Sequence, residues 1–167
     1  PLFAQAANPP EGPAYGAQLE GFEHPYTLKH FAFQSQGQSL QMGYMDVPAQ
    51  GKVNGRTVVL MHGKNFCAAT WGDSIKALSE AGYRVIAADQ VGFCTSSKPG
   101  YYQYSFQQLA SNTQALLKTL GVQKAVVLGH STGGMLATRY ALQFPDQVER
   151  LAMVNPIGLE DWKALGV

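Results

Sequence analysis

Short apolar runs alternate with amphipathic stretches over the later part of the chain. Four of these runs are only four or five residues long: residues 57–61, 84–88, 125–128 and 151–154. Short continuous runs are typical of strands buried on both faces, as in a parallel sheet covered by helices. The pattern therefore predicts a parallel sheet built from these four segments.

Two earlier segments have a different pattern. Residues 28–33 and 40–45 mix apolar and polar positions with residue types that favour strands. Between them, residues 34–37 read Gln-Ser-Gln-Gly, which is typical of a turn. This part of the chain is predicted to form an antiparallel β-hairpin.

Helical periodicity fills the intervals between the apolar runs. A first helix is predicted at 70–81, before a glycine that accepts the left-handed conformation after a helix. The second begins at Ser105, which forms a capping box with Gln108 three positions later. The third begins beside Ser131 and is stopped by Pro145.

The order of elements after the hairpin is βαβαβαβ. Because crossover connections between parallel strands are right-handed, this order predicts the α/β class. The expected fold is a doubly wound, mostly parallel sheet with an N-terminal antiparallel hairpin and about six strands in all.

The composition and net charge of the chain limit the classes of partner that it is expected to bind. The 167 residues are 46% hydrophobic and 14% charged, which predicts one domain with a packed core. A formal charge of +1 without a basic run gives no field that would attract nucleic acid or an anionic membrane. No stretch approaches the roughly 20 apolar residues of a membrane-spanning helix. We expect a small-molecule partner, no metal and no cofactor, since the two cysteines lack metal-ligand spacing.

The clearest chemical signal surrounds Ser131. Residues 125–134 read Ala-Val-Val-Leu-Gly-His-Ser-Thr-Gly-Gly, an apolar strand that runs into Gly-x-Ser-x-Gly and then a helix. Gly-x-Ser-x-Gly alone is a common pattern, but a strand before it and a helix after it make it specific, because they place the serine on a tight turn at positive φ. Side chains at Gly129 or Gly133 would collide with neighbouring backbone. Ser131 is therefore the predicted nucleophile.

Backbone N–H groups near Ser131 are expected to bind an oxyanion. Thr132 follows the serine at a helix N-terminus, so its N–H points at any negative charge formed by attack on a carbonyl. The second donor should come from the loop after residues 57–61, where Gly63 allows close approach. We expect this donor to be the Lys64 N–H, with the N–H or amide of Asn65 as the alternative.

In these segments the chain resembles the α/β-hydrolase superfamily, especially its epoxide hydrolase, haloalkane dehalogenase and small-esterase branch. The matching residues are His62-Gly63, Trp71, Asp89-Gln90-Val91-Gly92-Phe93, Ser96, Ser97, Pro99 and residues 129–134. The resemblance covers the N-terminal half of that fold. It implies eight strands, a lid after the sixth, and a triad in the order nucleophile, acid, histidine.

This resemblance divides the chain into three parts. Residues 1–20 are expected to form an extended arm, 21–157 the N-terminal part of the core domain, and 158–167 the start of a lid. Ala4-Gln5-Ala6 fits the pattern before a signal-peptidase cut, so residues 1–6 are a signal-peptide remnant or a flexible leader. A signal-peptide remnant would predict a periplasmic or secreted protein. A flexible leader leaves a cytoplasmic protein as the alternative.

The family also implies a histidine C-terminal to the nucleophile, and none follows Ser131 in this sequence. We therefore expect a second chain or a C-terminal remainder to supply the acid and the histidine. Glu160 and Asp161 lie where some family members place the acid, although lid residues are the favoured interpretation. His62 resembles a loop-anchoring residue, and the His130 side chain is expected to point away from Ser131.

The serine decides the expected chemistry. Epoxide hydrolases and dehalogenases form an alkyl ester on an aspartate, which Ser131 cannot do, so hydrolysis of a small ester or related acyl compound is favoured. The alternatives are a non-catalytic binding protein of the same fold and a perhydrolase or haloperoxidase side activity. Cys94 stands where the family usually has glycine. Cys67 and Cys94 are expected to lie close together, either as a disulfide, if the protein is exported, or as two separate, partly buried thiols.

Overall fold

The structure is a computed structural model that describes residues 12, 14–158, 160–161, 163–164 and 166. The predicted signal-peptide remnant at 1–6 lies outside the described residues, as does much of the predicted arm. The described elements are β1 Leu28–Ser35, β2 Gln38–Val47, β3 Thr57–Met61, η1 Ala68–Trp71, α1 Gly72–Glu80, β4 Arg84–Ala88, α2 Phe106–Thr119, β5 Ala125–His130, α3 Thr132–Gln143, η2 Pro145–Gln147 and β6 Val148–Val154.

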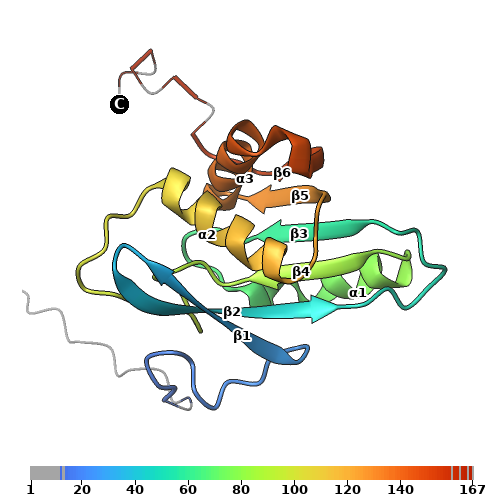
Figure 1. The fold of residues 1–167 in the computed structure, drawn as a ribbon, viewed down its shortest axis with the longest axis horizontal. Helices are drawn as coiled ribbons and strands as arrows, with labels where there is room; N and C mark the ends of the chain where they lie inside the picture. The colour runs from blue at the N-terminus through green and yellow to red at the C-terminus, as the bar shows by residue number, and fades with distance from the viewer. Residues whose placement is uncertain (1–11, 13, 159, 162, 165, 167) are drawn as a thin grey trace, which may run out of the picture.

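These strands form one six-stranded sheet in the order β1-β2-β4-β3-β5-β6 (Figure 1). The hairpin strands β1 and β2 are antiparallel to each other, and β2 is antiparallel to β4. From β4 onward every pairing is parallel. The predicted α/β fold, with a mostly parallel sheet and an N-terminal hairpin, is confirmed.

Helices cover both faces of the parallel strands because side chains alternate along each strand. Val59, Met61 and Val127 lie in the apolar cluster with α2 and α3. Val58 and Leu60 instead join the cluster that contains Ile75 of α1. β3 is therefore buried on both sides, which explains its continuous apolar sequence.

The hairpin is longer than the sequence predicted. Its strands continue to Ser35 and from Gln38, so the turn consists of Gln36 and Gly37 alone. Both turn residues have positive φ, 50° and 72°, as two-residue hairpins require.

The start of one helix and the cap of another differ from the prediction. The helix predicted at 70–81 is a 3-10 turn, η1, followed by α1 from Gly72. At α2 the Ser105 side chain accepts the N–H of Gln108 at 3.1 Å, but the Gln108 side chain donates to Asn112 Oδ1 at 3.0 Å. Only one half of the expected capping box is formed there.

The last strand, β6, begins three residues earlier than predicted and forms one edge of the sheet. Within the part of the chain that the structure describes, β6 pairs with β5 alone. Leu151, Met153 and Val154 are each about two-fifths exposed, at 37%, 41% and 42%. None of the described helices is long and apolar enough to cross a membrane.

Candidate functional site

Ser131 lies at the junction of β5 and α3. Its backbone has φ 54° and ψ −122°, a conformation that a residue with a side chain adopts only under constraint. The Ser131 N–H donates to Val154 O of β6 at 3.2 Å, and the Gly134 N–H donates to Ser131 O at 2.9 Å. The serine is thus fixed at a sharp turn above the ends of two parallel strands.

The two glycines that flank Ser131 are required by close backbone contacts. A Cβ atom on Gly129 would lie 2.1 Å from Gly133 O in the first turn of α3. A Cβ atom on Gly133 would lie 2.1 Å from Met61 O at the end of β3. The ends of β3 and β5 and the start of α3 are therefore in direct backbone contact, and only glycine fits at these two positions.

The loop after β3 lies against Ser131. A Cβ atom on Gly63 would be 3.0 Å from Ser131 Cβ. The Phe66 N–H donates to Gly63 O at 3.1 Å, closing a β-turn with Lys64 and Asn65 at its two central positions.

The backbone donors at this turn are free within the part of the chain that the structure describes. Neither the Lys64 N–H nor the Asn65 N–H bonds to another described residue, and Thr132 is the first residue of α3, so its N–H has no acceptor within the helix. The structure thus brings together Ser131 and the three candidate oxyanion donors.

Both imidazole nitrogens of the buried His62 are engaged. Nδ1 lies 2.8 Å from Gly63 O, and Nε2 lies 3.0 Å from the Gln90 N–H. Because a carbonyl only accepts and an N–H only donates, Nδ1 carries the proton and Nε2 is the acceptor. Burial lowers the pKa of His62, which favours this neutral form. His62 therefore anchors the loops after β3 and β4 and has no lone pair left for a substrate proton.

His130 precedes Ser131 in the chain, and its ring packs against aromatic side chains. The ring makes edge-to-face arrangements with Phe66 and Trp71, at centroid distances of 5.0 Å and 6.4 Å. No hydrogen bond joins its imidazole to Ser131 among the described residues.

The two remaining histidines lie elsewhere. His30 is exposed on β1, whereas His24 is half-buried, with Nδ1 3.1 Å from Phe22 O. Neither of them lies at the turn that carries Ser131.

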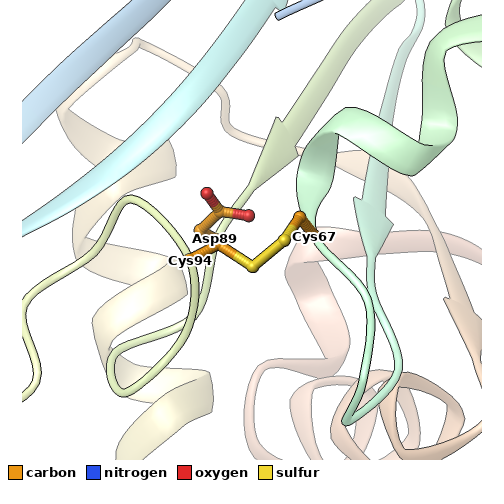
Figure 2. Close-up of side chains that lie close together, drawn as sticks. All are labelled: Cys67, Asp89 and Cys94. Atoms are coloured by element: carbon orange, nitrogen blue, oxygen red, sulfur yellow. A yellow bond between two sulfur atoms is a disulfide. The ribbon is translucent and has the colours of Figure 1, made fainter. Parts of the chain in front are cut away.

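A disulfide joins the loops after β3 and β4 (Figure 2). It links Cys67 to Cys94, whose Cα atoms are 5.9 Å apart and which are 27 positions apart in the sequence. Cys94 has φ 44°, so the cysteine occupies a left-handed position where glycine would be favoured. Its carbonyl also accepts from Lys98 Nζ at 2.6 Å.

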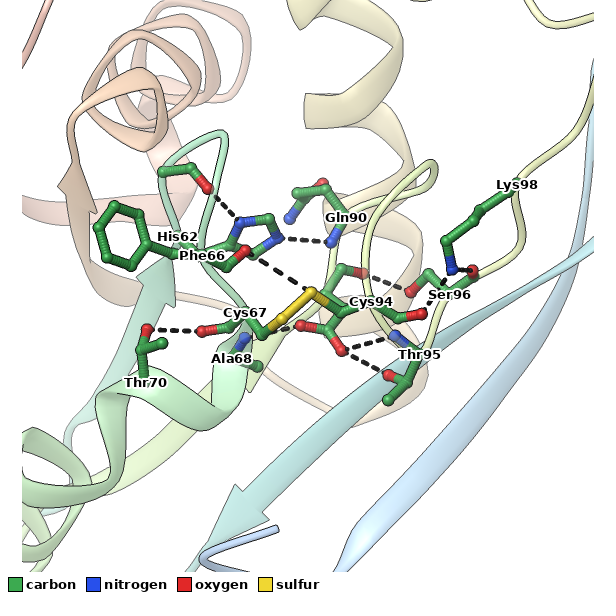
Figure 3. Close-up of a disulfide and its surroundings, with 12 residues drawn as sticks. His62, Phe66, Cys67, Ala68, Thr70, Gln90, Cys94, Thr95, Ser96 and Lys98 are labelled. Carbon is green, nitrogen blue, oxygen red and sulfur yellow. Dashed lines mark hydrogen bonds between the residues drawn. A yellow bond between two sulfur atoms is a disulfide. The ribbon is translucent and has the colours of Figure 1, made fainter. Parts of the chain in front are cut away.

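The buried carboxylate of Asp89 ties the same two loops a second time (Figure 3). Oδ1 accepts the N–H of Ala68 at 2.6 Å, and Oδ2 accepts both the N–H and the hydroxyl of Thr95. Ala68 and Thr95 are the residues that follow the two cysteines. We call this pair of links, the disulfide and the Asp89 carboxylate, the loop clamp.

The clamp also contains three potential metal ligands, since the ligand atoms of Cys67, Asp89 and Cys94 lie within 4.8 Å of one another. In the disulfide state neither sulfur is a thiolate, and both oxygens of Asp89 already accept hydrogen bonds. The arrangement of these residues is that of a structural link and not of a metal site.

A family model described as the alpha/beta hydrolase fold matches residues 56–166, which include β3, the elbow at Ser131 and β6. The chain belongs to the α/β-hydrolase family.

The known proteins that this chain resembles are longer than it, and the match covers part of each. A solved structure of a probable hydrolytic enzyme from Pseudomonas aeruginosa PAO1 is 68% identical, with a TM-score of 0.89, over 93% of this chain and 49% of that one. The AB hydrolase superfamily protein YfhM of Bacillus subtilis (strain 168) is 38% identical over 66% of this chain and 39% of its own length. Bifunctional epoxide hydrolase 2 of Sus scrofa is 37% identical over 61% of this chain and 19% of its own. The chain thus spans half or less of each relative.

In this α/β-hydrolase chain the two carboxylates considered for the triad make local contacts. Glu160 Oε2 accepts the N–H of Gly158 at 2.8 Å, and Asp161 Oδ1 accepts the N–H of Ala164 at 3.1 Å. Both side chains are exposed, in the segment that leads away from the sheet after β6 (Figure 1). The structure does not bring either of them to an imidazole among the described residues.

An apolar cavity of about 490 Å³ opens beside the candidate oxyanion donors of this α/β-hydrolase chain. Its lining includes Phe93, Tyr104, Phe106, Leu109, Thr132 and Leu136. Sequence reasoning assigned no role to Asp89 or to this cavity. The position of Asp89 directly after a buried strand was a usable signal, whereas the cavity walls come from four separate segments and have no common motif.

Proposed function

We propose that this chain carries the nucleophile of a serine hydrolase that cleaves a small ester or related acyl compound through an acyl-enzyme on Ser131. The observation that carries the proposal is the backbone of Ser131, with φ 54° between β5 and α3. A strained serine at a strand-to-helix turn exposes Oγ at the C-terminal edge of the sheet, as nucleophilic attack requires.

The proposed reaction begins with attack of Ser131 Oγ on the carbonyl carbon, while the proton of the hydroxyl passes to a histidine. The N–H groups of Thr132 and Lys64 hold the negative oxygen that develops, with Asn65 as the alternative second donor. The alcohol leaves with the proton from the histidine, and water then hydrolyses the acyl-enzyme by the same route.

The base in this proposal comes from outside residues 1–167. Both nitrogens of His62 are engaged, and the His130 ring packs against Phe66 and Trp71. The matched part of the Pseudomonas aeruginosa structure is 49% of that chain. We propose that a C-terminal remainder or a second chain supplies the acid and the histidine and pairs with the exposed edge of β6.

Serine chemistry favours esters over epoxides. An epoxide hydrolase similar to this chain is known from Sus scrofa, but opening an epoxide with Ser131 would leave an ether, which lacks a carbonyl for water to attack. Attack on an ester instead yields an acyl-enzyme that water can cleave.

The Cys67–Cys94 disulfide supports a periplasmic or secreted location, because disulfides persist mainly in oxidising compartments.

A fluorophosphonate probe tests the proposed function in the complete protein. Such a probe reacts with a serine only when a base activates it, so labelling should map to Ser131 and disappear in Ser131→Ala. In parallel, the kcat for a short-chain aryl ester should fall by several orders of magnitude in Ser131→Ala while the circular dichroism spectrum is unchanged. A complete protein that neither labels nor hydrolyses esters would instead be a non-catalytic member of the fold.

A further inference from the structure

The two loops that the Cys67–Cys94 disulfide joins differ in how firmly the rest of the chain holds them (Figure 3). The loop of Cys94 is bonded to the sheet, because the Gly43 N–H of β2 donates to the hydroxyl of Ser96 at 3.0 Å. The same hydroxyl donates to the Asp89 carbonyl oxygen at 2.6 Å, and Ser96 is fully buried. The Cys94 loop is therefore fixed to β2 and to the end of β4.

The turn that contains the candidate oxyanion donors has fewer restraints. Residues 64–66 are exposed, and in the described chain their one hydrogen bond between backbone groups is internal to the turn, from the Phe66 N–H to Gly63 O at 3.1 Å. The Phe66 ring packs on His130, a contact that limits the turn without fixing its distance from neighbouring groups. The turn therefore depends for its position on the residues at its two ends, and Cys67 forms the second end.

The disulfide connects this turn to the fixed loop. Cys67 follows the turn directly, and Cys94 Sγ lies 3.7 Å from the Phe66 carbonyl oxygen, so the sulfur bridge contacts the turn itself. The Asp89 carboxylate gives a second tie, but it holds the N–H of Ala68, one residue beyond Cys67. Along the chain, the disulfide is thus the nearer of the two ties to the candidate donors.

We propose that the Cys67–Cys94 disulfide positions the oxyanion donors, so that turnover at Ser131 depends on the oxidation state of these cysteines. The inference rests on the proposed role of Ser131. Donors of this kind act when they lie about 3 Å from the oxyanion. A displacement of about 1 Å can lower the rate by about a hundredfold. Without the bridge, hydrogen bonds alone join the turn to the Cys94 loop, and they permit such a displacement.

A dithiol breaks the bridge by thiol–disulfide exchange. Its thiolate attacks one sulfur of the bridge, and the other sulfur leaves as a thiolate and takes up a proton. The second thiolate of the reagent then attacks the mixed disulfide, which frees the remaining cysteine and leaves the reagent as a disulfide. Two electrons pass from the reagent to the protein, and two thiols form. Cys67 and Cys94 are both half-buried and not sealed in the core, so a small reagent can reach them.

The test compares the complete protein before and after treatment with dithiothreitol, at a temperature where circular dichroism shows both forms to be folded. Reduction should lower kcat for a short-chain aryl ester by about tenfold or more, with KM changed by less than about threefold. Binding of a trifluoromethyl ketone, which forms a tetrahedral oxyanion on an activated serine, should weaken by a similar factor. Reoxidation should restore both values. A disulfide that acts only on the unfolded chain would leave kcat of the folded protein unchanged.

The paired substitution Cys67→Ser with Cys94→Ser controls for other effects of the reagent. This variant should have the low kcat of the reduced wild type, and dithiothreitol should leave that value unchanged. If it does not fold, Cys67→Ala with Cys94→Gly tests the same point, because glycine favours the left-handed φ of 44° at position 94.

The two proposals fail in different ways. Labelling of Ser131 by a fluorophosphonate, combined with the same kcat in the oxidised and reduced forms, would leave the serine hydrolase standing and overturn this inference. A reduced protein that does not fold at any temperature would also overturn it, because the bridge would then hold the whole fold and not the donors. No labelling and no turnover in either form would remove both proposals.

Discussion

The carboxylate of Asp89 accepts the backbone N–H of Ala68 at 2.6 Å, which ties the end of β4 to the loop that carries the candidate oxyanion donors. The same side chain holds Thr95 through its other oxygen. A buried carboxylate with three donors thus joins two loops that are far apart in the sequence.

Asp89→Asn should destabilise the chain by about 1–3 kcal/mol, because an amide has one acceptor oxygen and brings an NH₂ group against backbone donors. Urea denaturation of the wild type and the variant measures the difference. Asp146→Asn replaces an exposed carboxylate in η2 and should change stability by less than about 0.5 kcal/mol. Equal effects of the two substitutions would contradict the role assigned to Asp89.

Removal of the disulfide should lower stability by about 3–4 kcal/mol, because the bond closes a loop of 27 residues in the unfolded chain. The paired substitution Cys67→Ser with Cys94→Ser tests this by thermal or urea denaturation. Reduction of the wild type with dithiothreitol should give a similar loss. Dithiothreitol should have no effect on the doubly substituted protein, and an effect there would show that the reagent acts at some other place.

Gly133→Ala should disrupt the turn at Ser131, since the added Cβ would lie 2.1 Å from Met61 O, a backbone atom that cannot move alone. Overpacking of this kind costs about 1–3 kcal/mol or more, and it should also reduce fluorophosphonate labelling of Ser131. Gly100→Ala is the matched control, because a Cβ there would meet no atom within 4 Å. Normal labelling and stability in Gly133→Ala would show that the turn is looser than described.

Stability should fall as the pH decreases from about 7 to 5, and His62 should account for part of the slope. Burial lowers the pKa of His62 from its ordinary value of 6.5. Below pH 6.5 the His62 imidazole therefore binds a proton in the unfolded chain but stays neutral in the folded chain. The stabilisation that is present above pH 6.5 is lost as the pH falls toward the pKa of His62 in the folded chain.

Urea denaturation at several pH values measures this slope, which is at most about 1.4 kcal/mol per pH unit for one proton. His62→Asn should flatten the curve between pH 7 and 5, whereas substitution of the exposed His30 should leave it unchanged. An identical slope in wild type and His62→Asn would mean that His62 is not the group that titrates.

Residues 1–167 expressed alone should self-associate and hydrolyse a short-chain aryl ester slowly. The exposed apolar edge of β6 offers unpaired backbone groups, and edge strands of this kind pair with other chains. Sedimentation and an ester assay measure both properties, and Met153→Lys should reduce association without unfolding the chain. A monomer with the turnover of an ordinary esterase would show that the base lies among the four histidines of this chain.

The sequence predicted the buried strands well and the edges of elements less well. β3 and β4 have the predicted bounds because every residue after the first in each strand is apolar. β6 starts earlier than predicted, since Glu149 and Arg150 interrupt the apolar pattern, and Glu149 is accommodated by an ion pair with Arg56 at 2.7 Å. A partner so distant in the sequence gives no local signal.

The candidate site shows the same difference between features that the local sequence sets and features that depend on distant segments. The strand, the turn and the glycines around Ser131 are local, so the sequence pattern was sufficient to predict the positive φ. The role of Asp89 depends on which backbone donors the fold brings to it, and Ala68 and Thr95 are separated by 27 positions. Contacts of this kind become visible only when the strands are placed side by side.

The hydrogen bond from the Ser131 N–H to Val154 O makes the Ser131 amide a reporter of the end of β6. This amide is shielded from solvent deuterium while the end of β6 stays in place, and it exchanges when that end opens. Its exchange rate in an NMR or mass-spectrometric experiment therefore records the local opening of the sheet edge at the proposed nucleophile. A polypeptide that adds a strand beyond β6 would slow exchange at Ser131 without touching the serine.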